Sequence, residues 1–154
     1  MTGGHETITP SPLVAEYLVG HGISVTGIGA ATVVAGKMTM PMVGGTLAVP
    51  SMRGVMTADG GVQFSGPLRT LQMRDFKLSH TGKGAQLSAV IDGKRIVLAR
   101  MPAAEVKMSG KSGKMTGGLR LSAAWANRIN QIVGKHVFSA GAAIGNLSAL
   151  VKVA

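Results

Sequence analysis

The chain has 154 residues and a formal net charge of +10, with 45% hydrophobic and only 14% charged residues. This composition excludes a disordered basic tail, which would be mostly polar, and the length suits one domain with one core. The absence of cysteine excludes disulfides and thiolate metal ligands. Because ten methionines accompany only three phenylalanines, one tryptophan and one tyrosine, we expect a core of aliphatic and thioether side chains.

The first residues, Met1–His5, have neither the basic nor the apolar region of a signal peptide. We therefore expect residues 1–10 to be disordered or left over from expression. Residues 11–154 are expected to form a single β-rich domain.

A short helix is predicted directly after this segment. Ser11 suits the N-cap and Pro12 the first helical position, and glycines at 20 and 22 end the apolar face. Residues 17–36 lack charged side chains, but five glycines and several β-branched residues interrupt them. This pattern favours strands over a membrane span.

The rest of the chain alternates between apolar and polar residues with a period of two, which predicts strands. Asp-Gly and Gly-Gly pairs between these runs indicate tight turns and therefore antiparallel pairing. The clearest alternating runs cover residues 38–43, 85–91, 96–100, 105–108, 119–121 and 147–153.

A second helix is predicted from Ser122 to about Val133, with Trp125 and Ile129 on its apolar face and Gly134 as its stop. Together these patterns predict a mainly β fold, a curved antiparallel sheet or sandwich with two short helices.

The motifs of common enzymes are incomplete. Gly110-Lys111-Ser112 resembles the end of a phosphate-binding loop, but Glu105 stands where the loop needs its first glycine. Six carboxylates in the whole chain, none at a spacing that pairs them locally, leave little material for acid–base catalysis. We therefore expect a binding protein and not an enzyme.

Met38, Met40 and Met42 carry the strongest metal-like pattern, since thioethers on one strand face could bind copper(I). The alternative, which we prefer, is that the three fill a core short of aromatics. The four histidines are scattered along the sequence and suggest no metal site.

The excess of lysine and arginine predicts an anionic partner. Nucleic acid is disfavoured, because stacking aromatics do not alternate with the basic residues. An anionic or amphipathic small molecule, a lipid headgroup or a component of the cell envelope accounts for the charge. Self-association through the uncharged residues 25–36 and 140–149 is a further alternative.

Several runs resemble the central strands of HtaA-type domains, which are secreted or surface-attached β-rich modules of high-GC Gram-positive bacteria. The similarity continues through the Trp125 helix and the segment at Phe138. The runs that carry it are Gly60–Gly66, Leu71–Leu78, Gly84–Val90 and Ile96–Ala99. The resemblance implies an exported or cell-surface module.

HtaA domains bind haem through a tyrosine on an early helix and a histidine that bonds to it, so the resemblance implies haem as ligand and Tyr17 as its iron ligand. The family histidine is not matched, since residues 66–71 read Gly-Pro-Leu-Arg-Thr-Leu. His80 is the nearest substitute, and Arg53, Arg69 and Arg100 are candidates for the propionates. The alternative for Tyr17 is a ring that packs on its helix with the hydroxyl at the surface.

The sequence therefore predicts a basic, non-enzymatic module that is exported or held at the cell surface and binds an amphipathic anionic ligand. Haem is the first candidate for this ligand. The alternatives are a structural, self-assembling or envelope-associated protein without a small-molecule ligand, and, less favoured, a nucleic-acid-binding protein.

Overall fold

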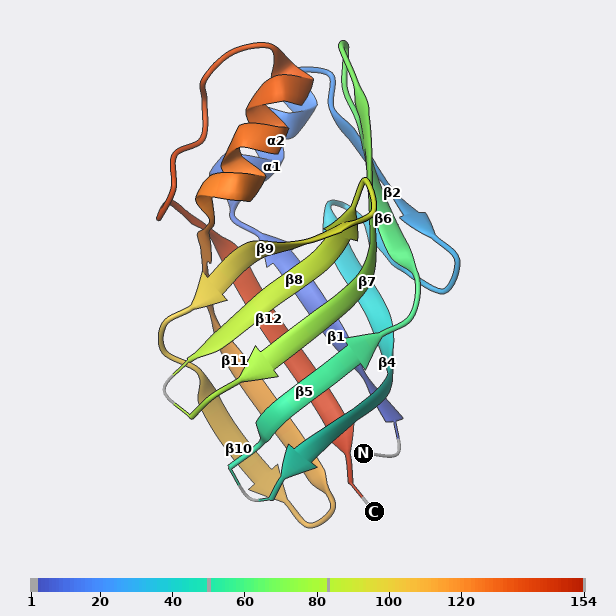
Figure 1. Cartoon of the computed structure of the whole chain (residues 1–154), viewed down its shortest axis with the longest axis vertical. Coiled ribbons are helices and arrows are strands. Elements are labelled where there is room, and N and C mark those ends of the chain that lie inside the picture. Colours follow the sequence, from blue (N-terminus) through green and yellow to red (C-terminus); the bar gives the residue numbers. More distant parts are fainter. Residues whose placement is uncertain (1–2, 50, 83, 154) are drawn as a thin grey trace.

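The computed structural model describes residues 3–49, 51–82 and 84–153. Twelve strands and two helices follow one another along the chain (Figure 1). In order they are β1 (Gly3–Pro10), α1 (Pro12–Gly20), β2 (Ser24–Ile28), β3 (Thr32–Val34), β4 (Lys37–Ala48), β5 (Arg53–Ala58), β6 (Gly61–Ser65), β7 (Thr70–His80), β8 (Ala85–Ile91), β9 (Lys94–Met101), β10 (Glu105–Ser109), β11 (Ser112–Leu121), α2 (Ala123–Val133) and β12 (Ala143–Lys152).

The strands form one antiparallel sheet that closes on itself. Its path runs β7-β5-β4-β1-β12-β11-β9-β8, and β8 also pairs with β7, which makes a ring of eight strands. β6 and β2 extend from β7, while β3 pairs with β4 and β10 with β11. The mainly β class and the curved antiparallel sheet are thus confirmed. Closure satisfies strand edges that an open sheet would expose.

The helices begin and end near the predicted residues. The Ser11 hydroxyl accepts a hydrogen bond from the Val14 amide at 3.4 Å, and that of Ser122 accepts one from the Trp125 amide at 3.1 Å. Gly134 ends α2 in the left-handed conformation, with φ of 86°. Both helices lie together at one end of the ring (Figure 1), which we call the helical end.

Residues 3–10 are ordered, so the expectation of disorder is wrong for this part of residues 1–10. They form β1, which pairs with β12 along its whole length and with β4 from His5 to Ile8. The inward side chains of this strand are Glu6 and Ile8. A carboxylate at an inward position breaks the apolar alternation, which is why the sequence pattern hides the strand. Residues 1 and 2 lie outside the described residues.

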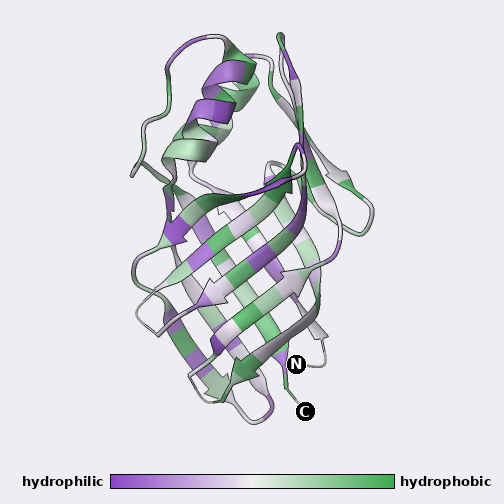
Figure 2. Cartoon of the chain, viewed as in Figure 1, coloured by the Kyte–Doolittle hydropathy of each residue, from purple (hydrophilic) through white to green (hydrophobic). Residues whose placement is uncertain are grey.

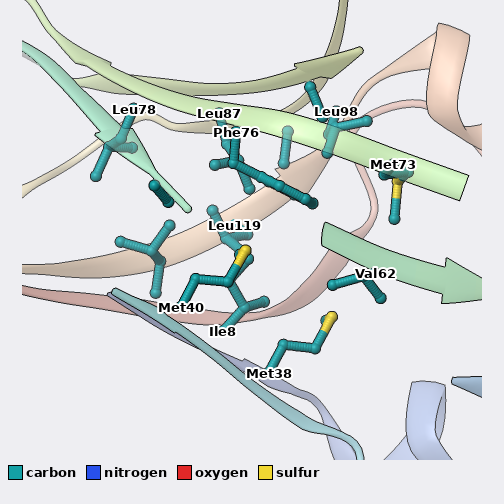
Figure 3. Packing of buried hydrophobic residues seen from close by; sticks show 14 of the residues in the cluster. Ile8, Met38, Met40, Val62, Met73, Phe76, Leu78, Leu87, Leu98 and Leu119 are labelled. Atoms are coloured by element: carbon teal, nitrogen blue, oxygen red, sulfur yellow. The ribbon is translucent and has the colours of Figure 1, made fainter. Parts of the chain in front are cut away.

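The interior of the ring is filled with aliphatic and thioether side chains. Met40 and Met56 are fully buried, and Met38, Met73 and Phe76 are nearly so. Figure 3 shows Met38 and Met40 of β4 beside Ile8 of β1, with side chains from the facing strands opposite them. An eight-stranded ring is just wide enough for side chains to fill it. The alternating methionines 38, 40 and 42 therefore serve as core residues.

Hydropathy follows this arrangement, because hydrophilic and hydrophobic residues alternate along the strands (Figure 2). On α2, the buried residues are Trp125, Ala126, Ile129 and Ile132, while Asn127 and Gln131 are exposed. Among the described residues, neither helix has the length and apolar character needed to cross a lipid bilayer.

Glu6 is a charged residue inside this apolar interior. Its side chain is 1% exposed, and neither carboxyl oxygen has a hydrogen-bond partner among the described residues. Burial raises the pKa of Glu6 from its usual 4.5 to about 7. The folded chain therefore holds this proton more tightly than the unfolded chain does, between about pH 4.5 and about pH 7.

We predict that Glu6→Gln flattens the pH dependence of stability. In the wild type, the free energy of unfolding falls as pH rises from about 4.5 to about 7, by ~3 kcal/mol for a pKa raised this far. The glutamine variant cannot ionise and should lose this fall, as measured by urea unfolding across that range. Glu16→Gln, an exposed change on α1, should keep the wild-type slope. Equal slopes for all three proteins would contradict the burial of Glu6 as an acid.

Candidate functional site

A cavity of about 540 Å³ lies at the helical end, between the two helices and the sheet. Each surrounding element contributes apolar side chains to its wall. Representative lining residues are Val14 and Leu18 of α1, Trp125 and Ile129 of α2, Phe64 of β6 and Met38 of β4. The volume falls within the range typical of small-molecule sites, about 300–1,000 Å³.

The chemistry of this wall is almost entirely apolar. Among the described residues, no lysine, arginine, histidine, aspartate or glutamate lines the cavity, and Ser24 is the one lining residue with a hydroxyl. Such a wall binds a large apolar body and leaves charged groups of a ligand to the rim. It offers no pair of groups for acid–base catalysis.

Helix α1 forms one wall without burying any of its own residues. Its side chains are at most half-buried, although Val14, Ala15 and Leu18 all line the cavity. Val19 lines it too and is 79% exposed, which places an opening beside the end of α1. The start of α1 is tied to the sheet by the hydrogen bond from the Ser11 N–H to the Ile144 carbonyl at 2.9 Å, and Val14 and Leu18 pack against the core.

Helix α2 is the fixed wall. Trp125 contacts Phe64 edge-on with ring centroids 6.1 Å apart, and the Ser122 hydroxyl donates to the Val97 carbonyl. A Cβ on Gly66 would lie 2.1 Å from the Ile132 side chain, so the close approach of the β6–β7 connection to α2 requires glycine there. These contacts hold Trp125 and Ile129 against the cavity.

Tyr17 lies on α1 at the edge of this cavity and does not line it. Its ring stacks on His21 with centroids 3.8 Å apart and meets Phe138 edge-on at 5.2 Å. Phe138 lines the cavity, so Tyr17 contacts a residue of the cavity wall. The Tyr17 hydroxyl is enclosed and has no hydrogen-bond partner among the described residues, unlike the surface hydroxyl of the alternative interpretation. Burial raises the pKa of Tyr17 above its usual 10.0.

His80 and Tyr17 are not brought together. His80 ends β7, where its neighbours in the sheet are Gly54 and Ala85, and its Nδ1 lies 3.0 Å from the Met52 carbonyl oxygen. This end of β7 points away from the helices (Figure 1). The histidine that contacts Tyr17 is His21, whose Nδ1 lies 2.9 Å from the Tyr17 carbonyl oxygen. Sequence reasoning missed it, although its spacing of four residues from Tyr17 was an available signal.

The three predicted arginines are also divided. Arg69 donates a hydrogen bond to Gln131 of α2 at 2.9 Å, which places it at the helical end. Arg100 of β9 is exposed and donates to Gln86 at 3.3 Å. Arg53 begins β5 beside the residues that surround His80, at the end of the ring away from the helices.

Conventional metal ligands do not cluster in the described part of the chain. No group of three or more histidine, aspartate or glutamate side chains lies close enough to hold an ion. Three of the histidines lie in different surroundings: His21 is on Tyr17, His80 is buried inside the ring, and His136 lies 3.2 Å from the Ser139 hydroxyl.

Comparison with solved structures identifies the class of fold. The C-terminal domain of HtaA from Corynebacterium glutamicum matches with a TM-score of 0.80 at 14% identity, over 98% of this chain and 96% of that one. The N-terminal domain of HtaA from the same organism matches with 0.77 at 19% identity, over 100% and 99%. The haem-binding protein HtaB of that organism matches with 0.64 at 16% identity, over 97% and 93%.

In sequence comparisons, neither a protein-family model nor a curated protein sequence matches the chain. The predicted resemblance to HtaA-type domains is therefore confirmed in the fold, which extends over the whole chain. At these identities the likeness shows the fold alone, so the ligand must be argued from the site.

We predict that Tyr17 ionises at a higher pH in the folded protein than in the unfolded chain. Tyr17 is the single tyrosine, so ultraviolet absorbance follows this one group. Phe138→Ala should lower the midpoint toward the ordinary value, because it uncovers one side of the ring. The same titration in denaturant supplies the reference. A folded midpoint equal to the denatured one would contradict an enclosed hydroxyl.

Proposed function

We propose that this chain is a non-enzymatic binding module, exported or held at the cell surface, for an amphipathic anionic ligand, with haem as the first candidate. The observation that carries the proposal is the apolar cavity covered by α1, a helix that buries none of its own side chains. The description of HtaB, a structural neighbour, as a haem-binding protein supports the choice of haem.

The lining residues suit the apolar ring of a porphyrin. Trp125, Phe64 and Phe138 offer aromatic surface, and Leu18 and Ile129 offer flat aliphatic contact. Because charged side chains are absent from the described wall, carboxylates of the ligand would have to lie at the rim. Arg69, fixed to α2 through Gln131, is the predicted arginine best placed for this role. Arg100 remains a candidate, while Arg53 and His80 lie too far from the helices to serve.

Tyr17 is the proposed iron ligand, since its enclosed hydroxyl has no partner among the described residues and its ring contacts Phe138, which lines the cavity. Bound haem supplies an iron centre that a tyrosine oxygen can ligate. Ligation requires the phenolate, and burial of Tyr17 opposes loss of its proton. In this proposal His21, stacked on Tyr17, positions the phenol ring in place of the expected His80.

A second function is favoured by apolar side chains on the outside of the helical end. Leu13 and Val19 of α1 are 80% and 79% exposed, and Val34 and Leu68 are also well exposed. Such residues could bind a second copy or an envelope component. In that case light scattering would show self-association and no porphyrin would enter the cavity.

Titrations with haemin and with iron-free protoporphyrin IX distinguish binding in the cavity from ligation of the iron, because protoporphyrin IX can only do the first. The wild type should bind both, with a Soret shift for haemin. Tyr17→Phe keeps the ring and loses the oxygen, so it should change the haemin spectrum and weaken haemin binding about tenfold or more while protoporphyrin binding stays the same. An unchanged haemin spectrum in Tyr17→Phe would remove Tyr17 as ligand. Absence of binding by either porphyrin would remove the proposed function.

We further predict that filling the cavity blocks the ligand. Ala15→Phe adds a ring to the wall formed by α1 and should weaken protoporphyrin binding at least about tenfold, measured as quenching of the single tryptophan, Trp125. Ala124→Phe is the matched control, because Ala124 is exposed on α2 and is not a lining residue. Equal affinities for both variants would show that the ligand binds elsewhere.

A further inference from the structure

The end of the ring away from the helices contains a residue in a strained backbone conformation. Met52, between β4 and β5, has φ of 57°, in the left-handed region where glycine or asparagine is usual. Its side chain is nonetheless 1% exposed. A bulky side chain is therefore held in the interior at a backbone conformation that bulky residues rarely adopt. Strained conformations of this kind concentrate at functional sites.

Two thioether sulfurs converge beside Met52. The Sδ atoms of Met52 and Met108 each lie 2.8 Å from the point that a Cβ on Gly113 would occupy. The two sulfur atoms are therefore separated by no more than twice 2.8 Å. Gly113 faces Met108 directly in the β10–β11 register and is buried. Any side chain on residue 113 would occupy the space between the two sulfur atoms. Glycine leaves this space free.

The imidazole of His80 is hydrogen-bonded through Nδ1 to the backbone of Met52, which leaves Nε2 as the nitrogen able to ligate a metal. His80 is 5% exposed, and its Nδ1 lies 3.0 Å from the Met52 carbonyl oxygen. A carbonyl can only accept, so in the neutral ring Nδ1 carries the proton and Nε2 carries a lone pair. Nε2 is buried and has no hydrogen-bond partner among the described residues. Histidines that ligate metals commonly donate their other N–H to a backbone carbonyl in this way.

We propose that Met52, Met108 and His80 form a binding site for a soft monovalent cation, copper(I), at the end of the ring opposite the porphyrin cavity. Two thioethers and one neutral imidazole are ligands that suit copper(I) and disfavour hard divalent ions, which need carboxylates. Met108 is half-buried on β10, so it offers an entry from the surface. The site shares no residue with the cavity wall, and it does not depend on the proposed porphyrin function.

The test uses protein labelled with ¹³C at the methionine methyl groups, titrated with silver(I) as an air-stable probe and then with copper(I) under anaerobic conditions. One equivalent should shift the methyl signals of Met52 and Met108 and leave that of Met73 in place. Met108→Leu, at a half-buried position, should fold and lose affinity about tenfold or more. His80→Gln, whose amide can still donate to the Met52 carbonyl, should lose affinity similarly. Met73→Leu, a buried change near the helical end, is the matched control.

A saturable one-equivalent site lost in Met108→Leu and retained in Met73→Leu supports the proposal. Thermal unfolding gives an independent readout, because a cation bound to the folded state should raise the midpoint of the wild type and not of Met108→Leu. No saturable binding, equal shifts at all methionine methyls, or wild-type affinity in Met108→Leu would overturn it.

Discussion

The structure depends on the closure of eight antiparallel strands into a ring whose interior is filled by its own side chains. Because the ring is this narrow, methionine, leucine and isoleucine occupy the space that a larger ring would leave to a ligand. Flexible thioethers fill the irregular gaps in a core with few aromatic rings. The apolar cavity lies beyond the end of the ring instead, where α1 and α2 form walls of their own.

The chemistry of the chain follows from this division. At the helical end the wall is apolar, with Tyr17 in contact with Phe138 and with Arg69 beside α2. Inside the ring, the few polar groups are costly, since Glu6 and the His80 Nε2 atom lack hydrogen-bond partners among the described residues. The two ends therefore differ in chemistry, and we propose a large amphipathic molecule as partner at one and a soft cation at the other.

Local patterns predicted much of this fold. The alternation at Met38, Met40 and Met42 indicated an inward strand face, and Ser11, Ser122 and Gly134 marked the helix ends, because these signals act over a few residues. β1 escaped prediction because Glu6 occupies an inward position that the alternation rule assigns to apolar residues. Closure of the ring also escaped, since the pairing of β7 with β8 on one side and β5 on the other is set by tertiary contacts.

The site was predicted less completely than the fold. Tyr17 was placed correctly on the first helix, yet His80 is separated from it by the length of the ring, and His21, one helical turn away, is its neighbour. The resemblance to HtaA-type domains suggested a tyrosine with a histidine partner, and His80 was the wrong choice of partner because sequence order along β7 does not reveal which end of the strand faces the helices. The cavity itself arises from elements far apart in the chain, so no single segment could indicate it.

The helical end of the ring is the proposed binding site, and a methyl and amide NMR titration with gallium protoporphyrin, a diamagnetic analogue of haem, examines it without substitutions. If the ligand binds there, chemical-shift changes will concentrate on α1, α2, β2 and β6, including the Trp125 indole and the Leu18 and Ile129 methyls. Changes centred on the opposite end of the ring, or on the basic outer surface, would contradict it.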